Sequence, residues 1–236
     1  IVKTAIRSYF IVVHRVKIIG TENIPKDKKE PLIYCGNHRT YKDPPLIVVT
    51  AKRHVRFLAK EELKKNPFFA FLGVVFGGIY VKRDSKDVSA LKTTLKALKN
   101  GESIALFPEG TRNGMEKGEK TKDGAAFFAV RSGALVVPCG IKGGEKGNRK
   151  VTITYGKPLD FSKYKGSKDK EVLDNITEEI MNNIIELTKW KISKFWYLFL
   201  IPQKRLVYCK KIKHNTIIYI KWLQIYWQKF NLVVQF

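Results

Sequence analysis

Apolar and polar positions divide residues 1–189 into short strand-like runs that alternate with segments of helical periodicity. Residues 31–35 form an apolar run closed by Gly36, which is typical of a buried strand. By the same criteria we expect strands at residues 54–59, 79–82, 103–107, 135–141 and 150–155, and helices at residues 44–49, 87–99, 125–131 and 167–189. This alternation predicts an α/β domain in which helices surround a mixed sheet.

The helix expected at residues 87–99 has the clearest pattern. It ends at Asn100-Gly101, a common helix stop. The apolar side chains that repeat at helical spacing, and that we expect on its inner face, are Val88, Leu91, Leu95 and Leu98.

The first 19 residues alternate apolar side chains with lysine and arginine, and we expect them to be the remnant of a membrane-facing helix. No stretch of the chain reaches 18 residues without a charge. The sequence therefore predicts neither a secure transmembrane span nor a complete signal peptide. Since residue 1 is isoleucine, we expect the natural chain to start further upstream.

Residue usage changes abruptly after Lys189. Residues 190–236 contain all four tryptophans and nine Lys and Arg residues, but no glycine, aspartate or glutamate. Two interpretations stay open: an interfacial anchor, because aromatic and basic side chains favour the membrane boundary, or a segment foreign to the domain, such as an out-of-frame extension. We therefore predict one domain over residues 1–189, followed by a basic aromatic tail over residues 190–236.

Composition restricts the possible partners. The chain has 236 residues, 44% of them hydrophobic, and a net charge of +24. This length fits one domain with its own core, and the positive balance draws a protein toward membrane lipid or nucleic acid. Zinc signatures, P-loops, GxSxG elbows and GxGxxG loops are absent. Cys35, Cys139 and Cys209 form no CxxC pair, and we interpret the first two as core residues of a protein in a reducing compartment.

His38 and Asp43 provide the first candidate chemistry. The reference pKa of histidine, about 6.5, suits a general base near neutrality. On one continuous helix the two side chains would point roughly 140° apart. A strand, a bent loop and a helix start, with Asp43 as the N-cap, instead let Asp43 hold one ring nitrogen while the other faces a substrate. The alternative is a loop histidine beside an ordinary helix cap.

The segment Phe107-Pro108-Glu109-Gly110-Thr111-Arg112 provides the second candidate chemistry. A turn-forming Pro-Glu-Gly run that ends in arginine is suited to hold a phosphate, although alone it is often an ordinary polar turn. Both segments follow predicted strands of one small domain. A base and an anion clamp together indicate chemistry on a phosphorylated alcohol.

Four segments together resemble the motif blocks of the glycerolipid acyltransferases, and they are most similar to those of the bacterial lysophosphatidate (1-acyl-sn-glycerol-3-phosphate) acyltransferases. In chain order they are residues 37–43 (NHRTYKD), 78–83 (GIYVKR), 107–112 (FPEGTR) and 136–141 (VVPCGI). A looser likeness extends over residues 15–189. One departure is Lys82, where the second block often has aspartate.

The resemblance implies transfer of an acyl chain from acyl-CoA or acyl-carrier protein to the sn-2 hydroxyl of lysophosphatidate, without a covalent acyl-enzyme. It implies that His38 takes the hydroxyl proton and that Asp43 orients the ring. Arg83 and Arg112 would bind the phosphate. It implies three further substrate-binding residues. Glu109 would bind a glycerol hydroxyl or hold an arginine in place, Gly110 would let the backbone approach the substrate closely, and Thr111 would contribute its hydroxyl.

The resemblance further implies no metal and no cofactor beyond the acyl co-substrate. The expected partners are a membrane surface, the lysophospholipid and the acyl donor, and the expected location is the cytoplasmic face of a membrane, as a peripheral or monotopic protein. Two alternatives stay open: an enzyme of the same superfamily that acts on glycerol-3-phosphate or another lysophospholipid, and a nucleic-acid-binding module. The second lacks a recognisable motif, and the charge is spread along the chain. Residues 68–72 either line an acyl-chain groove or belong to the core.

Overall fold

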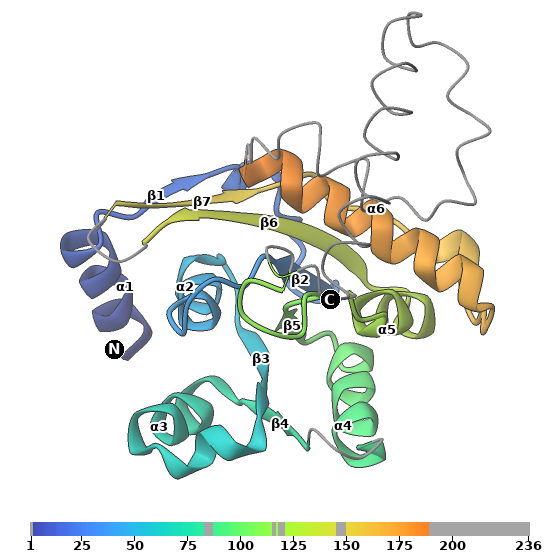
Figure 1. Cartoon of the computed structure of the whole chain (residues 1–236), viewed down its shortest axis with the longest axis horizontal. Coiled ribbons are helices and arrows are strands. Elements are labelled where there is room, and N and C mark those ends of the chain that lie inside the picture. Colours follow the sequence, from blue (N-terminus) through green and yellow to red (C-terminus); the bar gives the residue numbers. More distant parts are fainter. Residues whose placement is uncertain (1, 83–86, 115–116, 118–120, 145–149, 189–236) are drawn as a thin grey trace, which may run out of the picture. The chain divides into compact units, whose positions relative to one another are not determined.

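The computed structural model describes residues 2–82, 87–114, 117, 121–144 and 150–188. Arg83 and the predicted tail, residues 190–236, lie outside these ranges. Within them, seven strands form one sheet in the order β1-β7-β6-β2-β5-β3-β4 (Figure 1). The strands are β1 (Lys17–Ile19), β2 (Leu32–Gly36), β3 (Val55–Lys60), β4 (Ile79–Val81), β5 (Ser103–Leu106), β6 (Leu135–Gly143) and β7 (Val151–Tyr155).

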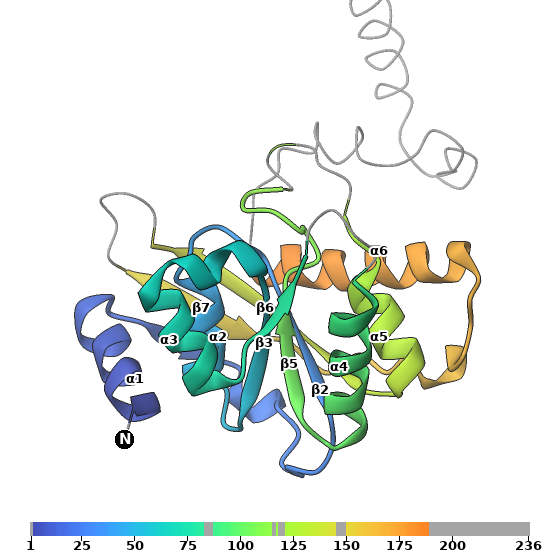
Figure 2. The same cartoon turned by 90° about the horizontal axis from the view of Figure 1, so that it is seen from below.

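Neighbouring strands are parallel except for the antiparallel pair β6–β7, so the predicted mixed sheet is confirmed. β2 lies between β5 and β6, with Cys35 opposite Leu106 and Gly36 opposite Cys139. All five residues of β2 are buried, as expected where helices cover both faces of a parallel sheet. Because β2 and β5 run side by side in parallel, the segments that follow them leave the sheet at the same edge (Figure 2).

Helices cover both faces of this sheet and create two hydrophobic cores (Figures 1 and 2). Leu32 and Tyr34 belong to one core, and Ile33 and Cys35 to the other, because side chains alternate along a strand. The first core packs against α1 (Val2–Val13), α2 (Asp43–Thr50) and α3 (Pro67–Phe76), and the second against α4 (Val88–Lys99), α5 (Gly124–Ser132) and α6 (Lys170–Thr188). Short 3-10 helices are η1 (Thr21–Asn23), η2 (Glu61–Lys65) and η3 (Ser162–Tyr164).

The strands and helices predicted from residue 31 onward are all present, with ends that differ by no more than three residues. The helix expected within residues 1–19 is present but shorter than predicted, because the last part of this segment is a strand. α1 ends at Val13, Arg15 has a positive φ of 44°, and β1 pairs in parallel with β7, Lys17 opposite Thr152. A partner so far along the chain leaves no local signal in a three-residue strand.

The inner face of α4 also differs from the predicted stripe. Val88 and Leu91 are exposed, at 55% and 36%, so only the C-terminal part of the stripe reaches the core. The buried residues of this helix are Ala90, Thr94, Ala97 and Leu98. Small side chains on the inner face let the helix approach the sheet closely, and the Thr94 hydroxyl is satisfied because it donates to the Ala90 carbonyl at 2.8 Å.

Cys35 and Cys139 are both free and fully buried, which confirms their interpretation as core residues. They belong to different cores, and burial raises the pKa of each thiol well above its usual range. Among the described residues, no helix combines the length and the apolar character needed to cross a bilayer.

The burial pattern of α4 predicts unequal costs for two leucine truncations on one helix. Leu98→Ala removes a side chain that is 1% exposed, and we expect it to lower the free energy of unfolding by about 2–5 kcal/mol. Leu91→Ala, at an exposed position of the same helix, should cost less than about 1 kcal/mol. Urea denaturation followed by circular dichroism measures both, and equal losses would contradict this inner face.

Candidate active site

Asn37 fixes the point at which the chain leaves β2. Its side chain is almost fully buried and makes two hydrogen bonds to β6. Nδ2 donates to the Ile141 carbonyl at 2.9 Å, and Oδ1 accepts from the Ile141 N–H at 2.7 Å. The amide thus extends the pairing of β2 and β6 by one position and holds the backbone immediately before His38.

The loop after β2 brings His38 and Asp43 together. Nδ1 of His38 lies 3.2 Å from Oδ2 of Asp43. The histidine side chain is 18% exposed and the aspartate side chain 4% exposed, so the ring is accessible whereas the carboxylate is enclosed. Since Nδ1 faces the carboxylate, Nε2 is the ring nitrogen that a substrate can approach.

Asp43 is not the helix N-cap that the sequence predicted. Lys42 occupies that position without a capping side chain, and Asp43 is the first residue of α2. An N-cap side chain accepts from N–H groups in the first turn, but Pro44 and Pro45 have none to donate.

The carboxylate of Asp43 instead accepts from the loop that precedes it. Oδ2 accepts from the backbone N–H groups of Arg39 and Thr40, each at 2.6 Å. Oδ1 accepts from the Thr40 hydroxyl at 2.9 Å. Three donors and the histidine ring therefore converge on one buried side chain, which determines how the loop is bent.

The segment after β5 holds His38 from the other side. Oε1 of Glu109, which is 2% exposed, accepts from the His38 backbone N–H at 2.9 Å. The Asn113 N–H donates to the His38 carbonyl at 2.6 Å. The Phe107 ring stacks on the His38 ring, with centroids 4.4 Å apart and planes inclined by 26°. Both loops therefore determine the position of His38.

Gly110 makes the turn that returns this segment toward Lys122. It has a φ of 68°, and its N–H donates to the Phe107 carbonyl at 3.0 Å. A Cβ at this position would lie 2.7 Å from Cε of Lys122. The left-handed backbone favours glycine here, whereas the flexible Lys122 side chain could move away from a Cβ.

Arg112 reaches the loop of His38 through Tyr41, an aromatic side chain with no predicted role. Its guanidinium carbon lies 3.9 Å from the centroid of the Tyr41 ring, a cation–π geometry. The Tyr41 ring in turn contacts the Phe69 ring of α3, at 5.4 Å between centroids. The only signal in the sequence was a tyrosine within an otherwise polar loop, which did not reveal its partner. Thr111 lies in the same loop as Arg112.

A pocket of about 440 Å³ opens beside Tyr41 and Phe69. Its lining joins the loop after β2 to the start of α3. The residues that line it are Tyr41, Glu62, Leu63, Lys65, Asn66, Pro67 and Phe69. Of the predicted apolar stretch at residues 68–72, Phe69 lines this pocket, Leu72 is in the core, and Phe68 and Phe71 are exposed.

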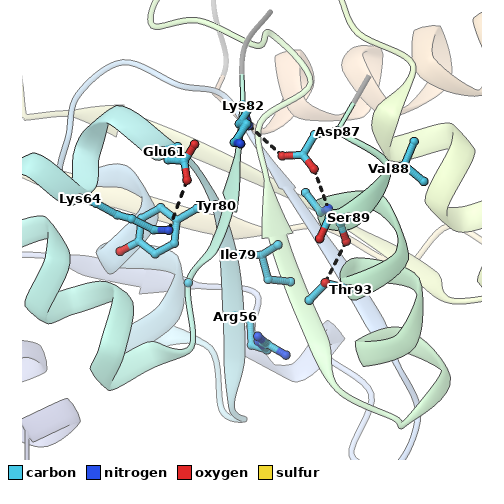
Figure 3. Close-up of a pocket in the computed structure, with 12 residues that line it drawn as sticks. Arg56, Glu61, Lys64, Ile79, Tyr80, Lys82, Asp87, Val88, Ser89 and Thr93 are labelled. Atoms are coloured by element: carbon cyan, nitrogen blue, oxygen red, sulfur yellow. Dashed lines mark hydrogen bonds and ion pairs between the residues drawn. The ribbon is translucent and has the colours of Figure 1, made fainter. Parts of the chain in front are cut away.

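A second pocket, of about 490 Å³, lies between β4, η2 and α4 (Figure 3). Two acidic side chains of its lining have partners there: Glu61 lies 3.5 Å from the Lys64 ammonium, and Asp87 accepts from the backbone N–H of Lys82 at 3.0 Å. Backbone N–H donors, those of Lys82 and Ala90 foremost, lower the pKa of Asp87. Among the described residues, no three His, Cys, Asp or Glu side chains lie together as metal ligands.

The chain is similar to known acyltransferases. The sequence model of the family described as Acyltransferase matches residues 15–142. The 1-acyl-sn-glycerol-3-phosphate acyltransferase of Streptococcus pneumoniae is 28% identical over 197 residues, 78% of this chain and 73% of that protein. The enzyme of the same name from Borreliella burgdorferi is 34% identical over 126 residues, which span 52% of this chain and half of the relative.

A solved structure is also similar. The 1-acyl-sn-glycerophosphate (LPA) acyltransferase of Thermotoga maritima superimposes with a TM-score of 0.56 at 28% sequence identity. The superposition covers 78% of this chain and 81% of the other.

The buried amide of Asn37 predicts a measurable structural cost. Asn37→Ala leaves the Ile141 N–H and carbonyl without their partner, and we expect it to lower the free energy of unfolding by about 1–3 kcal/mol. Asn183→Ala is the matched control, because Asn183 is only half-buried and its side chain donates to a carbonyl of its own helix. Urea denaturation compares the two, and a loss no greater than that of the control would show that Asn37 does not brace the loop.

Proposed function

The chain belongs to the acyltransferase family, as its four motif segments indicated, and we propose that it acylates the sn-2 hydroxyl of lysophosphatidate. Acyl-CoA or acyl-carrier protein supplies the chain as a thioester, and phosphatidate is the product. Relatives that carry this activity in their names support the acceptor. The observation that carries the proposal is the contact of His38 with Asp43 at the end of β2, because it orients a base toward an incoming hydroxyl.

The proposed reaction needs one base and no covalent intermediate. The sn-2 hydroxyl gives its proton to Nε2 of His38 while its oxygen attacks the thioester carbonyl. Collapse of the tetrahedral intermediate breaks the C–S bond, and the leaving thiolate takes the proton back from Nε2. Asp43 accepts from the Nδ1–H throughout, so it keeps the ring oriented and stabilises the imidazolium.

Glu109 acts on His38 through the main chain in this proposal. Its hydrogen bond to the His38 N–H positions the base relative to β5, and the stacked Phe107 ring restricts rotation of the imidazole. Glu109 is thus a positioning residue. A direct contact of its carboxylate with a glycerol hydroxyl stays a prediction, as does close approach of the substrate to the Gly110 backbone.

Arg112 is the proposed phosphate ligand among the described residues. Its guanidinium offers a planar set of donors that matches phosphate oxygens, and the Tyr41 ring holds one face of that plane. Thr111 adds a hydroxyl in the same loop. Arg83 is proposed to share the phosphate, on the resemblance of residues 78–83 to the second motif block alone.

The proposal places the protein on a membrane surface as a peripheral enzyme, at the cytoplasmic face, because acceptor and product are lipids. A direct assay tests it. Purified protein in detergent is given acyl-CoA or acyl-carrier protein, together with lysophosphatidate, glycerol-3-phosphate or a lysophospholipid with a head group. A kcat/KM that is higher with lysophosphatidate than with the other acceptors, with phosphatidate as the product, supports the proposal. A clear preference for another acceptor would overturn it.

His38 and Asp43 should affect turnover more than substrate binding. We expect His38→Ala to lower kcat by about 10²–10⁴-fold, because the base is lost, and Asp43→Asn to lower it strongly as well. His54→Ala is the matched control, since His54 is exposed and directly precedes β3. Steady-state kinetics on folded variants measure this, and a His38→Ala enzyme within tenfold of wild type would exclude the general-base role.

Arg112 and Tyr41 should affect acceptor binding. We expect Arg112→Ala to raise the acceptor KM by about 10–100-fold, the loss of a charge-assisted contact, with little change in the donor KM. Tyr41→Ala should raise it by only a few-fold, whereas Tyr41→Phe keeps the ring and should resemble wild type. A change confined to the donor KM would assign Arg112 to the donor, and equal effects of Tyr41→Phe and Tyr41→Ala would assign the role to the hydroxyl.

A further inference from the structure

α3 carries apolar side chains on the side that faces solvent. Its sequence, PFFAFLGVVF, contains no polar side chain. Phe68, Phe71 and Val74 are 60%, 52% and 85% exposed, and their spacing of three residues places them along one side. A helix on a protein surface normally carries polar residues there. We call these three residues the α3 outer face.

The helix cannot turn to bury this face, because its inner side and both ends are already occupied. A Cβ at Gly73 would collide with the Tyr80 hydroxyl, so the helix is seated closely on β4. Asn66 caps its start by accepting from the Phe68 and Phe69 N–H groups at 3.0 and 3.4 Å, and Gly77 ends it in a left-handed conformation. The α3 outer face is therefore a permanent part of the surface.

Two basic side chains lie close to the start of this face, and two glutamates of the same 3-10 helix balance their charge. Lys64 and Lys65 stand at the end of η2, directly before α3, while Glu61 and Glu62 stand at its start. Lys64 lies 3.5 Å from Glu61, and its ammonium is 4.6 Å from the centroid of the Tyr80 ring. The whole chain carries a net charge of +24, which attracts it to a negatively charged surface at longer range.

The α3 outer face is also continuous with the candidate active site. Phe68 contacts Phe69 at 5.5 Å between ring centroids, and Phe69 contacts Tyr41, which holds Arg112. The pocket of about 440 Å³ lies between the start of α3 and the loop that carries Tyr41. A lipid surface that touches α3 therefore lies beside the loop of His38.

We propose that the α3 outer face inserts into the interface of an anionic bilayer and so presents the active-site loop to membrane lipids. The inference rests on the proposed function, because only a lipid acceptor requires the site to lie close to a bilayer. A helix of ten residues is about 15 Å long. Three side chains on it make a poor protein interface, which needs about 800 Å² per partner, whereas insertion into lipid needs only a few apolar side chains. The net charge of +24 favours an anionic bilayer over a neutral one.

The test compares two double variants of the full chain. Phe68→Ser with Phe71→Ser makes the α3 outer face polar without changing the charge. Val88→Ser with Leu91→Ser is the matched control, since these residues are exposed apolar side chains of α4, on the other face of the sheet. Co-sedimentation with phosphatidylcholine vesicles, with and without phosphatidylglycerol, measures binding. Activity is measured on lysophosphatidate in the same vesicles and in detergent micelles.

We expect the α3 variant to bind anionic vesicles at least tenfold more weakly and to lose vesicle activity while it keeps detergent activity, and the α4 variant to resemble wild type. Unchanged vesicle binding would overturn the inference. So would a concentration-dependent dimer in light scattering that the α3 variant abolishes, because the face would then bind a second copy. If the double variant unfolds, Val74→Ser replaces it, because Val74 is 85% exposed. We expect this variant to bind anionic vesicles a few-fold more weakly, and the same outcomes would overturn the inference.

The two proposals fail in different ways. A wild-type protein that binds vesicles through α3 but transfers no acyl chain in either assay would contradict the proposed function and leave the docking surface intact. Full transfer in detergent, together with vesicle binding that is independent of α3, would support the proposed function and contradict the docking surface.

Discussion

The carboxylate of Asp43 organises the loop on which the proposed chemistry depends. It accepts from two backbone N–H groups and one hydroxyl of residues 39–40, and it lies 3.2 Å from the His38 ring. A buried donor left without a partner costs about 1–3 kcal/mol, so this set of contacts strongly favours one conformation of the loop. The side chain that orients the proposed base therefore also shapes the backbone that carries it. Pro44 and Pro45 contribute by removing the helix N–H groups that would compete for the same carboxylate.

The parallel pairing of β2 with β5 supplies the second half of the site. The two strands end at one edge of the sheet, so the loop of Glu109 lies against the loop of His38 although 71 residues separate them. Glu109 and Asn113 use the N–H and the carbonyl of His38, while Phe107 covers its ring. The proposed base is held at its main chain by the loop after β5 and at its ring by Asp43 of its own loop. It therefore keeps its position without help from a bound ligand, which favours catalysis by pre-organised geometry.

The surroundings of the site relate this geometry to a lipid substrate. Arg112, Tyr41 and Phe69 form a continuous series from the proposed phosphate ligand to α3, and the outer side of α3 is apolar. Polar chemistry and an apolar surface thus lie next to each other. Such an arrangement suits an acceptor whose phosphate is in water and whose acyl chain is in a bilayer.

Local sequence patterns determined much of this protein: the strands and helices from residue 31 onward, the mixed α/β class, the burial of Cys35 and Cys139, and the family. They also pointed to His38 with Asp43, because the spacing and the strand-loop-helix setting are local. Only the tertiary structure decided the features that depend on distant partners. These include β1 against β7, the inner face of α4, the contact of Glu109 with the His38 backbone and the stacking of Arg112 on Tyr41. The reason is physical: a periodic pattern reports which side of an element is apolar, whereas the partner of a carboxylate or an aromatic ring depends on which segments the sheet brings to one edge.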